Sequence, residues 1–160
     1  MYYGATQSAG GFPEPTDNNP ANHLQFPNHP TLAGSSPMKS VLIVDDHAVV
    51  RRTAGVLLTT PSHEFEVTGE AEDGQGAIHE AERLRPDLIV LDLSMPVMNG
   101  LEAAVTLRKM LPSVRLILFT SHDGPAVEQL ARLAGIDAVV PKSQAAELLL
   151  VQAQRLFELP

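Results

Sequence analysis

Five polar side chains that suit phosphate chemistry each stand at or directly after the end of a short apolar run. They are three carboxylates, a hydroxyl and an ammonium group, belonging to Asp45, Asp46, Asp92, Thr120 and Lys142. The runs have the length of buried β-strands, and the carboxyl ends of parallel strands are where open α/β sheets place ligands and catalytic groups. We therefore expect these side chains, although far apart in the sequence, to meet at one edge of a parallel sheet.

The chemistry of such a group of side chains follows from its charge. Three carboxylates in one place repel one another, so that either one takes up a proton or a cation binds among them. Because the sequence contains no cysteine, its oxygen ligands favour a hard cation, and Mg2+ is the usual one where phosphoryl groups are handled. An aspartate can then act as a nucleophile and form an acyl phosphate. Lys142 could pair with one phosphoryl oxygen, and the Thr120 hydroxyl could donate to another.

The elements that must position these groups are indicated by the hydrophobic pattern. Apolar runs predict strands at 41–44, 87–91, 114–119 and 138–140, and an alternating pattern predicts another at 65–71. Helical spacing of apolar residues predicts helices at 48–60, 74–85, 100–110, 124–134 and from about 143 to 157. This alternation indicates an α/β fold, with a parallel sheet covered by helices on both faces. In a doubly wound, flavodoxin-like sheet of order 2-1-3-4-5, the first and fifth helices share one face and the other three share the opposite face.

Residues 1–37 differ in composition from the rest of the chain. They hold six of the 13 prolines, no lysine or arginine, and little periodic apolar pattern. Such a segment buries too little apolar surface to offset the entropy of ordering it. The sequence therefore predicts a disordered N-terminal tail over 1–37 and one folded domain over 38–160.

Several classes of protein are disfavoured by composition. The net charge is −8 and no basic run is present, which argues against direct nucleic-acid binding by this chain. No apolar run approaches the roughly 18 residues of a membrane span. The N-terminus lacks the basic and apolar regions of a signal peptide. A cytoplasmic protein without membrane contact is the expectation.

Four motifs together resemble the receiver domain of two-component response regulators. In chain order they are Val44-Asp45-Asp46-His47, Leu91-Asp92-Leu93-Ser94-Met95-Pro96-Val97-Met98-Asn99-Gly100, Thr120-Ser121 and Lys142-Ser143. The resemblance covers about residues 38–158 and is closest to receivers of regulators with a helix-turn-helix output domain. No output domain is present within the 160 residues. A stand-alone receiver and the input half of a longer regulator are therefore both open.

The resemblance implies a phosphoacceptor switch rather than an enzyme in the usual sense, one that only assists its own phosphorylation and dephosphorylation. Asp92 would accept phosphate from the phosphohistidine of a sensor histidine kinase or phosphotransfer protein. Asp46 and Asp92 would hold Mg2+ together with the backbone carbonyl of Ser94, and Asp45 would act largely through water.

The resemblance also implies how the signal leaves the site. Thr120 would be the conformational switch, and Lys142 would pair with the phosphate. The fourth helix, the fifth strand and the fifth helix would form the output face, through which a homodimer is suggested by analogy alone. Ser94 and His122 would bracket the water that attacks the acyl phosphate. His47, at the start of the first helix, receives no catalytic role.

Two departures from the family pattern leave other functions open. Val139 stands where an aromatic switch residue is often found, and 38–160 contain no tyrosine or tryptophan. Ser143, not proline, follows Lys142, so a cis bond there would cost about 3 kcal/mol and is not expected. One alternative is an interaction module that keeps the fold without switching. A less favoured one is a haloacid-dehalogenase-type phosphatase, which would have an Asp-x-Asp pattern after the first strand, whereas this chain has Asp45-Asp46-His47.

Overall fold

A single parallel sheet forms the centre of the described part of the chain. The computed structural model describes residues 37–158, while 1–36 and 159–160 lie outside the described residues. The strands are β1 (Lys39–Val44), β2 (Phe65–Ala71), β3 (Leu88–Leu91), β4 (Arg115–Thr120) and β5 (Ala138–Pro141). All neighbouring strands pair in parallel in the order β2-β1-β3-β4-β5, which confirms the predicted doubly wound order.

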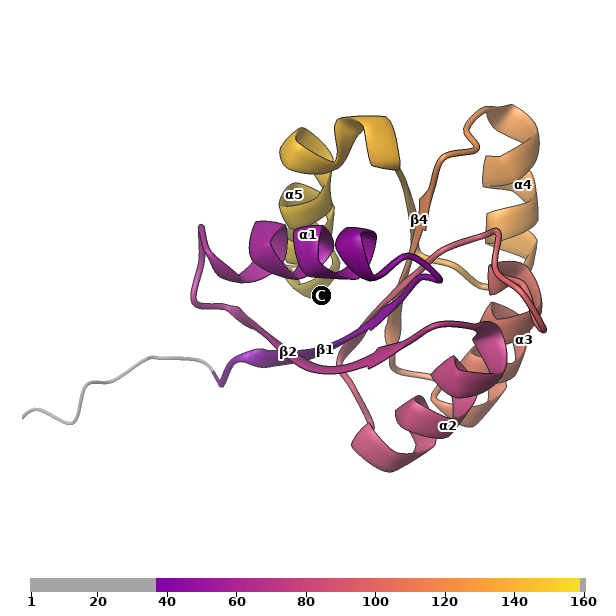
Figure 1. Cartoon of the computed structure of the whole chain (residues 1–160), viewed down its shortest axis with the longest axis horizontal. Coiled ribbons are helices and arrows are strands. Elements are labelled where there is room, and N and C mark those ends of the chain that lie inside the picture. Colours follow the sequence, from indigo (N-terminus) through magenta and orange to yellow (C-terminus); the bar gives the residue numbers. More distant parts are fainter. Residues whose placement is uncertain (1–36, 159–160) are drawn as a thin grey trace, which may run out of the picture. The chain divides into compact units, whose positions relative to one another are not determined.

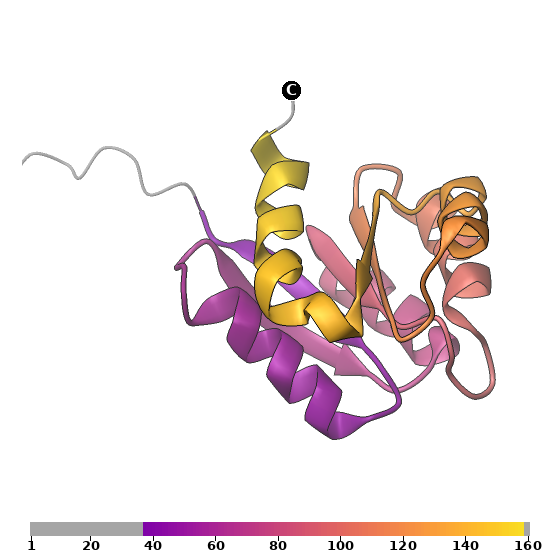
Figure 2. The same ribbon diagram turned by 90° about the horizontal axis from the view of Figure 1, so that it is seen from above.

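Helices follow each strand and cover both faces of this sheet (Figure 1). They are α1 (Ala48–Thr59), α2 (Gly74–Leu84), α3 (Gly100–Met110), α4 (Pro125–Leu133) and α5 (Ala145–Glu158). Helices α1 and α5 lie together on one face, and α2, α3 and α4 lie on the other, as Figure 2 shows from a second direction. The predicted distribution of the helices between the two faces is confirmed.

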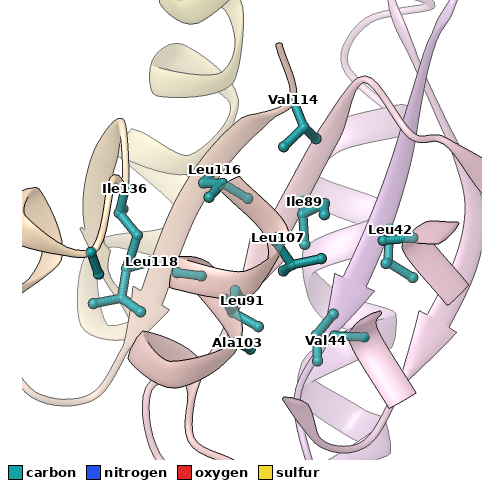
Figure 3. Packing of buried hydrophobic residues seen from close by; sticks show 14 of the residues in the cluster. Leu42, Val44, Ile89, Leu91, Ala103, Leu107, Val114, Leu116, Leu118 and Ile136 are labelled. Atoms are coloured by element: carbon teal, nitrogen blue, oxygen red, sulfur yellow. The ribbon is translucent and has the colours of Figure 1, made fainter. Parts of the chain in front are cut away.

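The core is divided by the sheet because successive strand residues point to opposite faces. Along β1, Val41 and Ile43 pack with the buried residues of α1 and α5. Leu42 and Val44 point the other way and pack with α2 and α3. Figure 3 shows this second cluster, in which side chains of β1, β3 and β4 meet those of α3. The central strands β1, β3 and β4 are therefore buried on both faces, as parallel strands in α/β proteins are.

The main difference from the predicted elements lies at the start of the last helix. The sequence predicts a start near Ser143, but a 3-10 turn occupies Lys142–Gln144, and α5 begins at Ala145. The difference arises because β5 runs one residue further than predicted, through Pro141. Lys142 is therefore the first residue after the strand and keeps the predicted place at the sheet edge. Its bond to Ser143 is trans, as are all described peptide bonds.

The predictions of a disordered tail and of no membrane span concern the whole chain, of which the structure describes residues 37–158. The predicted disordered tail, apart from residue 37, lies outside the described residues and stays a prediction. Among the helices of residues 37–158, none is both long and apolar enough to cross a membrane.

Candidate functional site

Asp45, Asp92 and Lys142 meet at the carboxyl edge of the sheet. Strands β1 and β3 are neighbours with Val44 opposite Leu91, so the two aspartates that follow them emerge side by side. The backbone fixes this register, since the Asp92 amide donates to the carbonyl of Val44 at 2.9 Å. Lys142 comes from β5, and its Nζ lies 2.6 Å from Asp45 Oδ2 and 3.2 Å from Asp92 Oδ1. One ammonium group thus bridges two carboxylates.

Burial makes it costly to keep the two carboxylates ionised. Asp45 is 1% exposed and Asp92 is 4% exposed, so little water reaches either carboxylate. Burial raises the pKa of Asp92 above its usual 3.8 and Asp45 adds to the rise, although Lys142 opposes it. Burial alone would lower the pKa of Lys142, but the contacts with Asp45 and Asp92 outweigh burial and raise the pKa. Lys142 therefore stays protonated, and Asp92 is a more basic carboxylate than an exposed aspartate.

Asp46 lies beside this pair and is more open to solvent, with its side chain 31% exposed. The imidazole of His47 reaches back towards both neighbouring carboxylates, with Nδ1 2.7 Å from Asp46 Oδ1 and 3.5 Å from Asp45 Oδ1. Possible ligand atoms of the three residues all lie within 4.8 Å of one another. The sequence analysis gave His47 no role, yet the structure places its ring against the predicted metal ligands.

Arg51 is a second residue that the sequence analysis missed. Its buried guanidinium donates from Nη1 to the backbone carbonyl of Asp45 at 2.7 Å and from Nε to Glu70 Oε2 at 2.7 Å. A third contact joins Nη2 to Glu72 Oε1 at 3.3 Å. Arg51 thereby anchors the acidic loop to the end of β2. A signal was available, because Arg51 shares helical spacing with the buried residues of α1, Ala54 and Leu58.

Thr120 ends β4 and is fully buried. The register of β4 and β5 places it opposite Pro141, directly before Lys142. Its Oγ1 accepts a hydrogen bond from the backbone amide of His122 at 3.1 Å. The structure therefore places Thr120 at the same edge as Lys142, where a switch residue is predicted, with its hydroxyl engaged by its own loop.

The loop after Asp92 is closed by the start of α3. Asn99 and Glu102 form a capping box, in which each side chain accepts from the other's backbone amide. The Gly100 amide donates to the carbonyl of Leu93 at 3.0 Å, and a Cβ on Gly100 would lie 2.0 Å from the Asp92 carbonyl oxygen. Only glycine fits this approach. Ser94 lies in the exposed part of the loop, and its role as a carbonyl ligand stays a prediction.

The donor set suits a hard divalent cation. Its oxygen ligands are the carboxylates of Asp45, Asp46 and Asp92, two of them buried, and they carry more negative charge than Lys142 neutralises. Carboxylate-rich sites of this kind favour Mg2+, Mn2+ or Ca2+. Beside them, Lys142 is positioned to pair with an anionic group attached to Asp92.

Comparison with known proteins places these features in a family. A family model described as "Response regulator receiver domain" matches residues 41–154. The response regulator protein VraR of Staphylococcus aureus (strain NCTC 8325 / PS 47) is 39% identical over 107 residues, which cover 67% of this chain and 51% of VraR. The chain therefore spans about half the length of the curated relatives it matches.

Solved structures agree with this result. A two-component response regulator of the LuxR family from Aurantimonas sp. SI85-9A1 is 31% identical, with a TM-score of 0.70 over 76% of this chain and 86% of that one. The chemotaxis protein CheY4 of Vibrio cholerae is 30% identical, with a TM-score of 0.66 over 74% of this chain and 98% of that one. The motifs, the fold and these relatives agree, and the chain belongs to the response regulator receiver domain family of two-component systems.

Proposed function

We propose that this domain is a phosphoacceptor switch in which Asp92 takes a phosphoryl group from a phosphohistidine. The donor is a sensor histidine kinase or a phosphotransfer protein. The observation that carries the proposal is the buried Asp92 carboxylate, whose Oδ1 lies 3.2 Å from the ammonium of Lys142 at the edge that also bears Asp45 and Asp46.

The reaction is a displacement at phosphorus. An oxygen of the Asp92 carboxylate forms the new bond to phosphorus, the P–N bond of the phosphohistidine breaks, and the histidine nitrogen leaves with the electron pair. A Mg2+ ion supplies neutralisation of the phosphoryl oxygens. Asp46, Asp92 and the Ser94 carbonyl would hold this ion, and Asp45 would act through water. Lys142, which already contacts Asp92, pairs with a phosphoryl oxygen of the product.

The output of the switch is a change of surface. Thr120 turns its hydroxyl from the amide of His122 towards the phosphoryl group, which biases the face formed by α4, β5 and α5 between two states. The domain assists its own phosphorylation and dephosphorylation but turns over no other substrate. It acts in the cytoplasm without binding nucleic acid or membrane, and the same face is the candidate for a homodimer contact.

The test is phosphorylation by acetyl phosphate with Mg2+, followed by intact mass and Phos-tag electrophoresis. Wild type should gain one phosphoryl group, and Asp92→Asn should gain none. Asp123→Asn is the matched control, because Asp123 is an exposed aspartate in the loop after β4 at the same edge. Equal phosphate in wild type and Asp92→Asn, or none in wild type, would overturn the proposal.

A second candidate function is a receiver-like interaction module that does not switch. Val139, half-buried on β5 where an aromatic relay is often found, favours it. Beryllofluoride with Mg2+ should change the amide NMR shifts of α4, β5 and α5 if the domain switches. Shift changes confined to the loops that carry Asp45, Asp92 and Thr120 would favour the module instead.

A further inference from the structure

We propose that the imidazole of His47 is a ligand of the divalent cation held by Asp46, so that this site accepts Mn2+, Co2+ and Ni2+ through a nitrogen donor. The inference rests on the metal site of the proposed function and adds a residue to it. His47 thereby acts in metal selection, a role distinct from phosphoryl transfer at Asp92.

The distances from the His47 ring nitrogen to the two carboxylates fit ligands of one metal ion. Neighbouring ligands of an octahedral ion with bonds of about 2.1 Å lie roughly 3.0 Å apart. His47 Nδ1 lies 2.7 Å from Asp46 Oδ1 and 3.5 Å from Asp45 Oδ1, which is the spacing of adjacent ligands on one ion. Ligand atoms of Asp45, Asp46 and His47 also lie within 4.8 Å of one another.

Hydrogen bonds hold the backbone of His47 in place beside the carboxylates. The His47 amide donates to Asp45 Oδ1 at 2.9 Å, and its carbonyl accepts from the amides of Val50 and Arg51 at the start of α1. Arg51 in turn fixes the carbonyl of Asp45. The backbone of His47 is therefore held by the turn beside the carboxylates, and the 71% exposure of its side chain leaves the outer side of the site open to water ligands.

A nitrogen donor beside oxygen donors changes which metal ions the site prefers. Imidazole nitrogen suits Co2+ and Ni2+, whereas Mg2+ prefers oxygen and retains water. Affinity rises from Mn2+ to Ni2+ at almost any site, so this order alone is not diagnostic. The diagnostic quantity is the dependence of each ion's affinity on His47. Removal of the ring should weaken Ni2+ and Co2+ binding and leave Mg2+ binding nearly unchanged.

Calorimetric titration of the full chain with MgCl2, CoCl2 and NiCl2 tests this dependence. His47→Ala should weaken Ni2+ and Co2+ binding about tenfold or more, as loss of a group at a metal site commonly does, and change Mg2+ binding less than about twofold. His63→Ala is the matched control, because it removes another exposed histidine, in the segment between α1 and β2 and away from the site, and should change none of the three. The five other histidines are present in both wild type and His47→Ala, so their binding cancels in the comparison.

A direct spectroscopic measurement does not depend on the stability of any variant. Electron spin-echo modulation of Mn2+ bound to wild type should show a coordinated imidazole nitrogen, and His47→Ala should lose that signal. Absence of the signal in wild type, or its persistence in His47→Ala, overturns the inference.

The metal site itself is tested separately by Asp46→Asn. If Asp46→Asn weakens Mg2+ binding and His47→Ala leaves Ni2+ binding and the nitrogen signal unchanged, the metal site stands and the role of His47 falls. If wild type and Asp46→Asn bind Mg2+ equally, the proposed metal site falls as well.

Discussion

The two edges of the sheet differ in how their charged side chains are paired. At the amino edge, the Arg108 guanidinium makes five hydrogen bonds, to the carbonyls of Pro112, Val114 and Gly135 (two of them) and to Asp137 Oδ2. Each of its five N–H groups is used. At the carboxyl edge, one ammonium group serves two carboxylates, and Asp46 adds a third negative charge.

The amino edge repeats this pattern at a second position. Asp87 Oδ2 accepts from both the amide and the hydroxyl of Ser40, and the Asp87 amide lies 3.1 Å from the same hydroxyl oxygen. These contacts tie the start of β1 to the residue before β3. Charges at the amino edge are thus matched by donors and acceptors of the fold, and they hold the chain together.

This difference indicates which edge of the sheet can change its energy when a ligand binds. A fully bonded charge stabilises one state and gains nothing from a ligand. A surplus of buried negative charge destabilises the free domain, so a cation or a transferred group that relieves the surplus shifts its energy. Variants that remove single contacts at either edge test this contrast.

The largest effect is expected from breaking the amino edge at Arg108. Arg108→Ala removes the guanidinium donor from three carbonyls and leaves Asp137 Oδ2 with the Leu116 amide as its remaining donor, which should lower the free energy of unfolding by about 3–4 kcal/mol. Urea unfolding followed by circular dichroism measures it. Arg108→Lys, with fewer donors, should fall between wild type and Arg108→Ala. A loss below about 1 kcal/mol would show that the amino edge does not depend on this residue.

A substitution at Gly100 tests whether the carboxyl edge tolerates any displacement. Gly100→Ala forces the Asp92 carbonyl away from a Cβ that would lie 2.0 Å from it, at an expected cost of about 2–3 kcal/mol. The same variant should also take up phosphate from acetyl phosphate more slowly. Gly55→Ala, inside α1 with ordinary contacts of 3.5 Å or more, is the control and should not be destabilised. Equal melting temperatures for the two variants would contradict the close approach.

A substitution at Arg51 tests whether the carboxyl edge also depends on an arginine that makes several hydrogen bonds, as the amino edge does on Arg108. Arg51→Met keeps much of the buried stem but removes the donor to the Asp45 carbonyl, with an expected loss of about 1–2 kcal/mol. Mg2+ affinity, measured by calorimetry, should fall in the same variant because the acidic loop loses its anchor. Arg52→Met alters an exposed neighbour and should leave both quantities unchanged. Unchanged Mg2+ affinity in Arg51→Met would limit Arg51 to a structural role.

The smallest effect, and the one of opposite sign, is expected at Asp92. Because its pKa is raised above 3.8, the protonated form is favoured by folding, and that stability is lost as pH rises from 3.8 through the raised pKa. At neutral pH the ionised carboxylate therefore costs stability. Asp92→Asn should gain about 1 kcal/mol at pH 7, with a gain that shrinks as pH falls towards 3.8.

The comparison of edges supplies the control for this prediction. Asp87→Asn removes a charge that is bonded to Ser40 at the amino edge, and it should lose stability rather than gain it. Thermal melts at several pH values measure both variants. A gain in both, or a loss in both, would remove the distinction between the two edges.

Most of the fold could be predicted from sequence because its signals are local. The central strands β1, β3 and β4 are short apolar runs buried on both faces, and residues such as Pro61 and Pro86 lie between elements and separate them. The strand order then followed from the family resemblance and the connection rules. The meeting of Asp45, Asp92 and Lys142 was predictable as well, because the carboxyl ends of parallel strands share one edge.

What could not be predicted depends on side-chain contacts across the fold. Arg108 bonds to residues 27 and 29 positions away, and no local pattern distinguishes it from a surface arginine of α3. The direction of the His47 ring depends on a rotamer beside two carboxylates. The contacts of Arg51 required knowing that the end of β2 lies next to the acidic loop.

The loop between β3 and α3 joins a fixed base to a free tip. Gly100 lies against the Asp92 carbonyl at the base, while Val97 at the tip is 85% exposed with a positive φ of 67°. Substitutions at the tip can therefore change the exposed surface of this loop without moving Asp92. A set of substitutions at Val97, with Gly100 kept, would thus alter the loop surface while the position of the Asp92 carbonyl is preserved.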